Sequence, residues 1–509
     1  MHRPEVNFNL AAQILRQADL SHDRLAIIFE GRERSYGQLA SRVRQLAGLL
    51  RARGVSLGDR VGFLGLNQPE LLETMLAANA LGAVFVPLNF RLTAQELTFI
   101  IGDAGVHTLI VDAELAPVIE PVVADLPCRH WFCVEGDQGI FEALEPAITV
   151  AEPITDVVEL GAHDTLLIMY TSGTTGLPKG AMLTHGNIIW NNVNASFAFG
   201  AKRTDVGLTV APLFHIGGLN VLTLTTLQMG NPLVLMRNFE PGAVLENIER
   251  YRVTHMFGAP AMYLFMAQHP SFETADLSSV EMFIVGAAPC PESLITLYGA
   301  RGVQFCQGYG LTETAPFGSF LGPDKSLDKL GSAGLPSVLT ELRIVDADNR
   351  PLPPQERGEV CIRGPNIMKG YWNRPEATAA AIDNEGWFHS GDIGYLDDEG
   401  YLFICDRVKD MVISGGENVY PAEVESVLFE HPAISEVAVI GLPDDKWGEA
   451  VTAVAALNAN HSLTLEELRA FADKKLARYK LPLRLHLVEA LPRNPAGKVL
   501  KFQLREQFA

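Results

Sequence analysis

Cysteine is scarce in this 509-residue sequence, and its positions exclude a dense metal or disulfide framework. The six cysteines are scattered, no two of them form a CxxC pair, and no histidines follow them at zinc-finger spacing. Structural zinc sites and disulfide scaffolds are recognised by such close spacings. We therefore expect neither of them, and we expect a reducing, cytoplasmic setting.

Long uninterrupted hydrophobic runs are also lacking. Polar residues interrupt the first twenty positions before an apolar stretch of signal-peptide length develops. The most apolar long stretch, residues 220–236, contains Gln228, Asn231 and Pro232, whereas a membrane helix needs about 20 apolar residues in succession. We therefore expect no secretion signal and no transmembrane segment, and at most a peripheral contact with membranes.

Positive charge is in deficit. Forty lysines and arginines stand against sixty aspartates and glutamates, so the formal net charge is −20. This excess of negative charge opposes binding to nucleic acid, and it requires that local donors hold any anionic ligand. The basic stretch KKLARYKLPLR, residues 474–484, is the main local exception. It is either a solvated helix face or a contact for a phosphorylated substrate.

What the sequence does contain is an alternation of helical and strand-like segments. Residues 35–54 show the apolar periodicity of a helix, and residues 59–66 read as a strand. The alternation recurs along the first 300 residues, where the apolar runs end in glycine, proline or hydroxyl residues. This pattern predicts layered α/β subdomains with ligands bound where the strands end.

The last third of the chain has a different pattern of predicted secondary structure. Residues 342–364 and 395–407 read as short strands joined by turns, which predicts a β-rich subdomain. An α+β segment follows the polar stretch DRVKD at residues 406–410. Because 509 residues exceed one ordinary core, we expect a large N-terminal domain, 1–408, and a small mobile C-terminal domain, 409–509.

The stretch YTSGTTGLPKG, residues 170–180, follows an apolar run and combines glycines, hydroxyl residues and one lysine. Glycines allow backbone amides to point inward, hydroxyls donate hydrogen bonds, and a lysine adds charge. The order differs from a Walker A loop. A flexible surface loop is the alternative, but the preceding strand and the lysine favour phosphate binding. The residues concerned are Thr171, Ser172, Gly173, Thr174, Thr175, Gly176 and Lys179.

Three further residues are weak signals when each is taken alone. Glu313 in GYGLTET is either a solvated loop acid or a ligand of Mg²⁺ on nucleotide phosphates. Asp392 in WFHSGD is either a cap or an acceptor for ribose hydroxyls. Lys498 in PRNPAGKVLK is either a surface lysine or a catalytic cation.

Taken together, these stretches resemble the adenylate-forming superfamily, which includes acyl-CoA synthetases, nonribosomal peptide adenylation domains and firefly-type luciferases. The resemblance extends from RSYGQLA at 34–40 to NPAGKVLK at 494–501, nearly the full length. The stretches DRVKDMVISGGENVYPAEVE at 406–425 and ARYKLP at 477–482 resemble bacterial fatty-acid CoA ligases most.

The resemblance implies a role for each motif. The residues from Thr171 to Lys179 would bind the β- and γ-phosphates of ATP, and Thr312 and Glu313 would contact the α-phosphate and Mg²⁺. Lys498 would bridge the substrate carboxylate and the α-phosphate. The implied reaction joins a carboxylic acid to coenzyme A through an acyl adenylate, with positioning and charge neutralisation as its main sources of catalysis.

The implied nucleotide and coenzyme A sites include further residues. Tyr309 would stack on the adenine, and Asp392 and Arg407 would bind the ribose. Lys409 would be the hinge about which the C-terminal domain rotates between the two half-reactions. The remaining residues implied at the nucleotide or at the pantetheine arm of coenzyme A are Gly286, Ala287, Ala288, Gln307, Gly308, Gly310, Gly415 and Gly416.

The implied acyl pocket is apolar or small in character, and its stretches contain no arginine or lysine to meet a second carboxylate. We therefore expect a medium- or long-chain fatty acid in preference to malonate or succinate, while an aromatic acid stays open because apolar walls accept both. His215 is either a pocket gate or a core histidine. The pocket residues are His215, Gly217, Met256, Phe257 and Ala315, together with 286–287 and 308–314.

Other functions stay open at this point. An adenylating enzyme that loads a carrier protein in trans is the alternative within enzymes, because only eleven residues follow Lys498. A luciferase-type oxygenase is disfavoured. An inactive nucleotide-binding protein is opposed by the joint presence of Lys179, Glu313, Asp392 and Lys498. The sequence leaves the oligomeric state and the pathway open.

Overall fold

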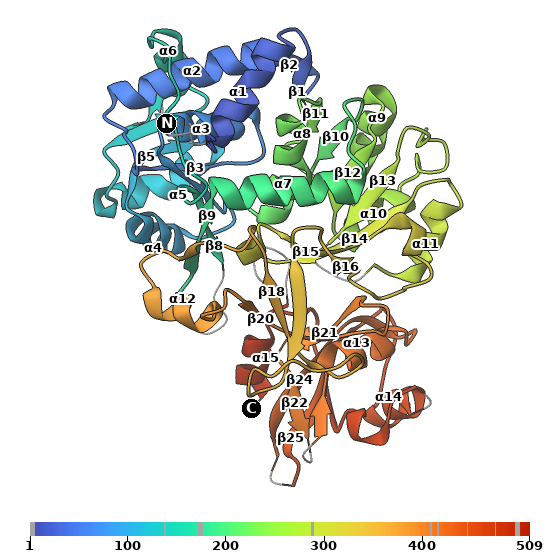
Figure 1. Cartoon of the computed structure of the whole chain (residues 1–509). Helices are drawn as coiled ribbons and strands as arrows, with labels where there is room; N and C mark the ends of the chain where they lie inside the picture. Colours follow the sequence, from blue (N-terminus) through green and yellow to red (C-terminus); the bar gives the residue numbers. More distant parts are fainter. Residues whose placement is uncertain are drawn as a thin grey trace. The chain divides into compact units, whose positions relative to one another are not determined.

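The computed structural model describes residues 6–136, 139–171, 177–286, 290–407, 410–414, 417–444, 446–473, 475–493 and 499–508. The chain divides into two compact units, each built from two segments of the sequence (Figure 1). The first unit comprises Met1–Leu342 and Ile362–Phe388, and the second comprises Arg343–Cys361 and His389–Ala509. The mixed α/β architecture predicted from the sequence is confirmed.

The first unit contains an eight-stranded sheet that is parallel except at one edge. Its central strands are continuous apolar runs, and Phe63, Phe85 and Phe132 are fully buried, as expected for a sheet covered on both faces. The strands at that edge pair in the antiparallel direction, and one of them begins with the predicted Lys179. In spatial order the strands are β19 (Gly370–Tyr371), β9 (Lys179–Thr184), β8 (Thr165–Thr171), β4 (Val84–Leu88), β3 (Arg60–Leu64), β5 (Val106–Val111), β6 (His130–Cys133) and β7 (Glu142–Ala143).

A nine-stranded sheet forms the rest of the first unit's framework. Six strands in its middle pair in parallel, and antiparallel strands close both edges. In spatial order they are β16 (Leu335–Pro336), β15 (Phe317–Leu321), β14 (Phe305–Gly310), β13 (Met282–Val285), β12 (His255–Gly258), β10 (Gly207–Thr209), β11 (Leu233–Leu235), β1 (Leu25–Phe29) and β2 (Arg32–Ser35).

Helices cover these sheets and begin at residues that cap them. Ser35, Thr93 and Thr184 each form a reciprocal capping box with the residue three positions on. Helix α7 contacts both β9 and β15, so it lies between the two sheets (Figure 1). The helices are α1 (Leu10–Leu20), α2 (Tyr36–Ala52), α3 (Pro69–Ala80), α4 (Ala94–Ala104), α5 (Ala116–Ile119), α6 (Leu144–Thr149), α7 (His185–Phe199), α8 (Leu224–Gln228), α9 (Pro241–Tyr251), α10 (Pro260–Gln268), α11 (Glu292–Gly299) and α12 (Pro375–Ala381).

Short helical turns connect several of these elements. A π-helical turn, η3, spans Gly217–Thr223 and leads directly into α8. The 3₁₀ turn η4 follows β14 and contains two residues of the predicted site. The 3₁₀ turns of the first unit are η1 (Ala113–Leu115), η2 (Glu120–Asp125), η4 (Thr312–Thr314) and η5 (Pro323–Lys325).

The second unit contains a four-stranded sheet and a five-stranded sheet. The former is the predicted β-rich subdomain, with strand order β17 (Glu341–Val345), β18 (Gly358–Arg363), β20 (Phe388–Leu396) and β21 (Leu402–Arg407). The predicted hinge residue, Lys409, lies outside the described residues, so the boundary near it stays a prediction. The other elements are β22 (Val412–Ser414), β23 (Glu417–Val419), β24 (Ile434–Asp444), β25 (Gly448–Leu457), β26 (Arg484–Leu487), α13 (Pro421–Phe429), α14 (Leu465–Ala472), η6 (Arg478–Lys480) and α15 (Lys501–Phe508).

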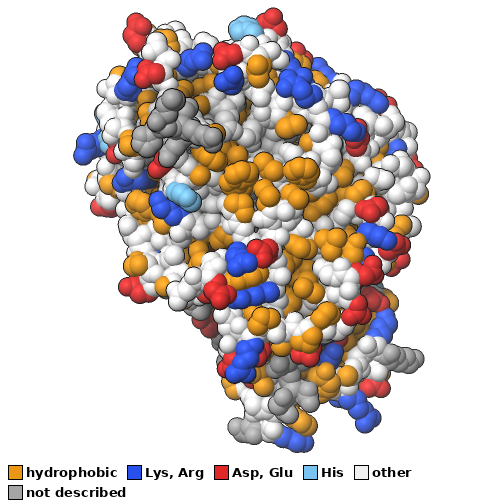
Figure 2. Space-filling view, in the orientation of Figure 1, with side chains coloured by type: hydrophobic (Ala, Val, Ile, Leu, Met, Phe, Trp, Pro, Cys, Tyr) orange, Lys and Arg blue, Asp and Glu red, His pale blue; other side chains and the backbone are white. Residues whose placement is uncertain are grey.

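The basic stretch near the C-terminus is engaged in ion pairs. Lys475 contacts Glu430, Lys480 contacts Glu423, and the Arg484 guanidinium lies 2.8 Å from Asp444. Lysines and arginines also lie among aspartates and glutamates on the face drawn in Figure 2. These pairings favour a structural role for the stretch over phosphate binding. Among the described residues, the helices are too short or too polar to cross a bilayer.

Candidate active site

The predicted phosphate loop connects two paired strands at the edge of the eight-stranded sheet. Thr171, the last residue of β8, is in register with Lys179, the first residue of β9. The Thr171 hydroxyl lies 3.4 Å from the Lys179 carbonyl oxygen. The antiparallel pairing therefore fixes both ends of the loop, whose residues 172–176 lie outside the described part of the chain.

Three side chains from distant parts of the sequence meet beside this hairpin. The Lys179 ammonium lies over the ring of Tyr371, 5.1 Å from its centroid. The Tyr371 hydroxyl donates a hydrogen bond of 2.8 Å to the carboxylate Oε1 of Glu313, whose side chain is buried. Two predicted residues, Lys179 and Glu313, are thus joined through a tyrosine that the sequence did not single out.

Tyr371 is itself held on both sides. It pairs with Ala181 in the β19–β9 ladder, and its amide donates to the Thr378 hydroxyl at 2.9 Å. The preceding Gly370 has a φ of 142°, and a side chain there would collide with Thr378 at 2.6 Å. The pairing of β19 with β9 and the contact with Thr378 of α12 together fix the position of Tyr371 and therefore the direction of its hydroxyl.

The turn that carries Thr312 and Glu313 is built from buried polar contacts. The Asn366 amide donates to the Thr314 carbonyl at 2.7 Å and to the Phe317 carbonyl at 2.8 Å. The Met368 amide donates to the Glu313 carbonyl at 2.8 Å. The donors, Asn366 and Met368, lie outside the turn, and their hydrogen bonds hold it so that the Glu313 side chain faces Tyr371.

Glu313 has the chemistry that Mg²⁺ requires. Mg²⁺ takes oxygen ligands and is commonly held by one or two carboxylates together with substrate phosphates. The carboxylate uses Oε1 for Tyr371 and lies at the end of β14, near the strand ends where the sequence predicts the nucleotide. Its donor type therefore fits the metal that the resemblance implies.

Three residues predicted for the acyl pocket, Gly217, Phe257 and Gly286, meet at the ring of Phe257, near the end of β12. A methyl group on Gly217 would lie 2.9 Å from Cε1 of this ring, and a methyl group on Gly286 would lie 2.9 Å from Cε2. Gly308 similarly leaves space for the ring of Phe317, 2.8 Å from where a methyl group would be. Three predicted glycines therefore make room for two aromatic rings.

His215 precedes the π-helical turn and packs on the ring of Phe214, with centroids 4.2 Å apart. Burial, with a smaller contribution from the charge of Arg91, lowers the pKa of His215 to about 4. The Arg91 guanidinium lies over the rings of Phe90 and Phe214, 5.2 and 5.8 Å from their centroids. A cation thus lies beside the predicted pocket, from a segment outside the stretches considered above.

The remaining pocket residues lie in the described core. Met256 is fully buried, and its carbonyl accepts a hydrogen bond from the Tyr263 hydroxyl. Ala315 is also buried, and its carbonyl accepts from the Asn220 amide at 2.5 Å. Gln307 accepts from the Cys290 amide at 3.0 Å. Their roles at a ligand stay predictions, as does that of the half-buried Tyr309.

Gly310 is constrained more tightly than the other predicted glycines. A side chain there would overlap the Pro316 carbonyl oxygen, only 1.6 Å away. Glycine is therefore required for β14 to pass close to the segment that follows Glu313. The sequence identified the residue by resemblance, and the close backbone approach gives the physical reason.

Asp392 lies in the second unit, on β20. Its side chain is buried, and its amide donates to the Ser390 hydroxyl at 3.0 Å. It is in register with Arg407 on β21, as expected for two residues that serve one ligand group. The predicted residues outside the described part of the chain are Ser172, Gly173, Thr174, Thr175, Gly176, Ala287, Ala288, Lys409, Gly415, Gly416 and Lys498, and the side chain of Arg407 is also outside it.

Comparison with known proteins places this geometry in a family. Residues 14–372 match the family described as AMP-binding enzyme, and residues 423–498 match the AMP-binding enzyme C-terminal domain. The chain is 43% identical to a feruloyl-CoA synthase of Amycolatopsis sp over 99% of each chain. It is 42% identical to the long-chain-fatty-acid–CoA ligase FadD13 of Mycobacterium tuberculosis over 93% of each chain.

Solved structures agree with these relatives. A fatty acyl CoA synthetase of Mycobacterium tuberculosis superposes with a TM-score of 0.81 at 39% identity, over 98% of each chain. The o-succinylbenzoate coenzyme A synthetase of Bacillus subtilis, in complex with ATP and magnesium ion, superposes with a TM-score of 0.88 at 33% identity, over 97% of this chain and 98% of that one. The chain therefore belongs to the AMP-binding enzyme family.

Proposed function

We propose that this AMP-binding enzyme is an acid–CoA ligase whose carboxylic acid carries an aromatic ring. The observation that carries the aromatic assignment is the Phe257 ring, held between Gly217 and Gly286 in the predicted acyl pocket. Relatives named feruloyl-CoA synthase and indoleacetate–CoA ligase, 43% and 40% identical, support it. This proposal replaces the sequence-based preference for a fatty acid.

The pocket suits a flat and compact acyl group. Phe257 fills the space between the start of η3 and the end of β13, so a substrate meets an aromatic wall at this point. The ring packs with an apolar cluster that includes Phe199 and Phe317. Aromatic pairs contribute about 0.5–1.5 kcal/mol beyond the area they bury, which favours an aryl group over a flexible alkyl chain here.

In the first half-reaction, a carboxylate oxygen of the acid attacks the α-phosphorus of ATP and pyrophosphate leaves. Lys179 supplies a fixed positive charge at the hairpin for the phosphates that depart. Glu313, oriented by Tyr371, would hold Mg²⁺, which neutralises phosphate charge when bound. Lys498 would bring its ammonium between the carboxylate and the α-phosphate, where removal of one such donor costs about 10²–10³ in rate.

In the second half-reaction, the thiol of coenzyme A attacks the acyl carbonyl, and AMP leaves with the oxygen that came from the acid. Asp392 would accept hydrogen bonds from the ribose hydroxyls in both halves of the reaction. Gly415 and Gly416 would allow the backbone to approach the pantetheine arm. No side chain serves as a nucleophile, so positioning and electrostatics account for the rate.

A medium- or long-chain fatty acid is the second candidate. It is favoured by the 42% identity to FadD13 and by the fatty acyl CoA synthetase structure. An apolar channel would contribute about 0.8 kcal/mol for each methylene buried, roughly fourfold in kcat/KM. Activity would then rise steadily with chain length from butyrate.

A panel of acids with ATP and coenzyme A tests the proposal. It should contain ferulate, indole-3-acetate, a series of linear fatty acids and one aromatic dicarboxylate, because Arg91 lies beside the pocket. We expect acid-dependent pyrophosphate release and thioester formation, with the highest kcat/KM for an aromatic monocarboxylate. A steady climb along the fatty-acid series above the aromatic acids would establish the second candidate, and thioester formation with none of the acids would refute both.

The Gly286→Ala variant tests the role of Phe257 directly. The added methyl group must displace the Phe257 ring, and overpacking of this kind costs about 1–3 kcal/mol. We expect kcat/KM for the preferred aromatic acid to fall about tenfold. Gly299→Ala, at the end of α11, is the matched control, because a methyl group there meets no neighbouring element within 4 Å. Equal activity of the two variants would exclude Phe257 from the substrate site.

A further inference from the structure

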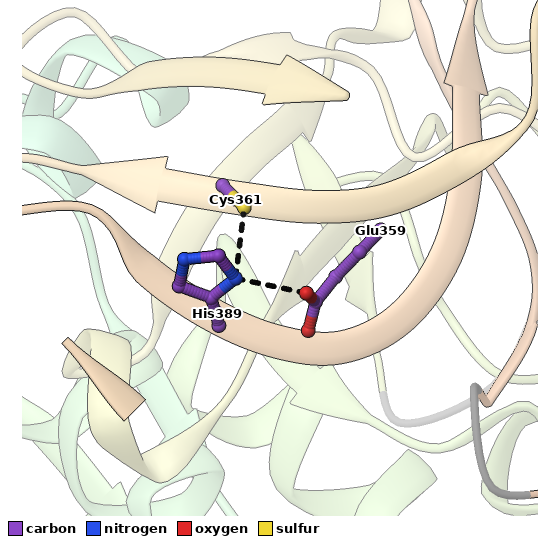
Figure 3. Close-up of side chains that lie close together, drawn as sticks. All are labelled: Glu359, Cys361 and His389. Carbon is purple, nitrogen blue, oxygen red and sulfur yellow. Dashed lines mark hydrogen bonds and ion pairs between the residues drawn. The ribbon is translucent and has the colours of Figure 1, made fainter. Parts of the chain in front are cut away.

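A cluster of metal-binding side chain types lies in the second unit, apart from the residues assigned to the reaction. Glu359 and Cys361 are two positions apart on β18, so both side chains point to the same face of the four-stranded sheet. His389 lies on β20, the neighbouring strand, and points toward both of them (Figure 3). All three belong to one compact unit, so their arrangement is internal to it.

The distances within the cluster are close to those of a metal site. His389 Nδ1 lies 3.5 Å from Cys361 Sγ and 2.8 Å from Glu359 Oε2, and the ligand atoms of all three residues lie within 4.8 Å of one another. With ordinary zinc bond lengths and tetrahedral angles, sulfur and nitrogen ligands are about 3.6 Å apart, and nitrogen and oxygen ligands about 3.3 Å. The separation of His389 Nδ1 and Glu359 Oε2 must therefore lengthen by about half an ångström, and the carboxylate must also come within ligand distance of Cys361 Sγ.

The donor types select the kind of cation. A thiolate, an imidazole and a carboxylate together suit Zn²⁺ and similar divalent transition metals, whereas Mg²⁺ and Ca²⁺ prefer oxygen ligands throughout. Cys361 is fully buried, while 20% of the His389 side chain and 26% of the Glu359 side chain stay exposed. The exposed side gives a cation an entry path and leaves the fourth position to water.

We propose that Glu359, Cys361 and His389 form a binding site for one zinc-type transition-metal ion. The carboxylate of Glu359 is already oriented, because its Oε1 accepts a hydrogen bond of 3.0 Å from the Gly391 amide while Oε2 faces the histidine. Such a contact from outside the ligand set is what holds metal ligands in place in established sites. A cation of this type binds a thiolate and an unprotonated imidazole nitrogen, so binding releases the thiol proton of Cys361 and requires that His389 carry no proton on Nδ1.

The site is coupled to the segment that carries Asp392. Gly391, which donates to Glu359, has a φ of 69° and directly precedes Asp392. The Ser390 hydroxyl donates to the Val360 carbonyl at 2.6 Å and accepts from the Asp392 amide, so this segment is tied to β18 between two of the proposed ligands. A bound cation therefore fixes the turn that leads into Asp392.

The spacing of these residues explains why the sequence predicts no such site. Cys361 and His389 are 28 positions apart, and the pairing of β18 with β20 brings them together. The alternative is a hydrogen-bonded trio in which His389 donates to Glu359 and no cation binds. The two arrangements differ in their response to added metal.

Titration of the full, metal-free chain with Co²⁺, a spectroscopic substitute for Zn²⁺, tests the proposal. We expect one equivalent to bind with a thiolate-to-cobalt charge-transfer band and the intense visible absorption of a four-coordinate ion. Cys361→Ser should remove the charge-transfer band. Loss of a contact outside the ligand set already costs about 10–100-fold in metal affinity, so His389→Gln and Glu359→Gln should weaken binding at least tenfold.

Cys405→Ser is the matched control, because Cys405 lies in the same sheet, on β21, and is half-buried. It should retain the band and the affinity of the unaltered chain. Absence of the band in the unaltered chain, or its persistence in Cys361→Ser, would overturn the proposal. The first of these outcomes requires no variant, so the proposal stays testable even if one substitution prevents folding. Binding is independent of ligase activity, so neither result depends on the proposed function.

Discussion

At the scale of single residues, the hydroxyl of Tyr371 connects the cation and the acid of the candidate active site. This hydroxyl donates a hydrogen bond to the carboxylate of Glu313. Hydrogen bonds to charged groups contribute about 1.5–3 kcal/mol to stability. Tyr371→Phe removes this bond and keeps the ring beneath Lys179. We therefore expect acid-dependent pyrophosphate release to slow about tenfold or more, with a loss of about 1.5–3 kcal/mol in the free energy of unfolding.

The control for this prediction is Tyr251→Phe, at the end of α9 in the same unit. It should leave both rate and stability unchanged. An orienting role for the Tyr371 hydroxyl also predicts a higher Mg²⁺ concentration for half-maximal rate in Tyr371→Phe. An unchanged Mg²⁺ dependence together with an unchanged rate would remove Tyr371 from the site.

A second residue-level feature is the buried His185 at the start of α7. Its Nδ1 accepts a hydrogen bond of 3.1 Å from the Leu10 amide, and burial lowers its pKa to about 4 from an ordinary value of 6.5. Between pH 6.5 and pH 4, His185 is therefore protonated to a greater extent in the unfolded chain than in the folded one. Stability is therefore complete above pH 6.5 and falls as the pH drops, by about 2 kcal/mol at pH 5 from this group.

His185→Asn keeps an acceptor for the Leu10 amide and cannot be protonated in this range. Urea unfolding at pH 7 and at pH 5 should show a smaller loss of stability for the variant than for the unaltered chain. His215, whose pKa is also lowered to about 4, adds a loss of the same sign in both proteins and cancels in the comparison. Equal losses in the two proteins would show that His185 does not titrate as described.

The sequence motifs singled out the charged residues of the candidate site, Lys179 and Glu313, but not the residues that contact them. Lys179 and Glu313 stood in recognisable motifs, whereas Tyr371 has a role only because β19 pairs with β9. Arg91 escaped notice because the contact with Phe214 joins segments that are far apart in the sequence. A pairing between distant segments leaves no local pattern, so these contacts required the fold.

At the scale of secondary structure elements, the turn η4 depends on one buried side chain. Asn366 is fully buried and donates to two carbonyl groups that follow Glu313 in the chain, those of Thr314 and Phe317. Asn366→Ala leaves both carbonyls without this donor, and each such loss costs about 1–3 kcal/mol. We expect a loss of about 2–6 kcal/mol in the free energy of unfolding, together with slower adenylation.

Asn247→Ala provides the comparison, because Asn247 donates to a carbonyl of its own helix, that of Ala243 at 2.7 Å, and to the Met236 sulfur at 3.9 Å. It should lower stability less and leave the rate of adenylation unchanged. Chemical denaturation and pyrophosphate release, measured on both variants, separate the two effects. An Asn366→Ala protein with full stability would contradict the role given to this side chain.

Elements whose apolar residues recur at a regular spacing could be predicted from the sequence. Elements without such a spacing could not. Residues 35–54 were predicted as a helix and contain α2, Tyr36–Ala52, because their apolar positions recur every three to four residues. The π-helical turn η3 has no such signal, since its first two residues are glycines. Phe257 was predicted in the pocket, but its confinement by Gly217 and Gly286 appears only when β12, the end of β13 and η3 come together.

At the scale of the whole molecule, the assigned residues are divided between two units. Lys179, Glu313 and Tyr371 belong to the first, and Asp392 belongs to the second. The sequence predicted a β-rich part from its turns and short strands, but placed it within the N-terminal domain. In the structure it clusters with the C-terminal residues, because residues 343–361 pair with strands that follow residue 388.

The central claim is that the acid is activated as an acyl adenylate before coenzyme A attacks. An acid labelled with ¹⁸O in both carboxylate oxygens tests it most directly, with mass spectrometry of the products formed from ATP and coenzyme A. The oxygen that attacks the α-phosphorus stays with AMP when the thiol displaces it. We predict AMP that carries one ¹⁸O, in amounts equal to the thioester, and unlabelled pyrophosphate. Unlabelled AMP, or the formation of ADP and phosphate in its place, would contradict the account.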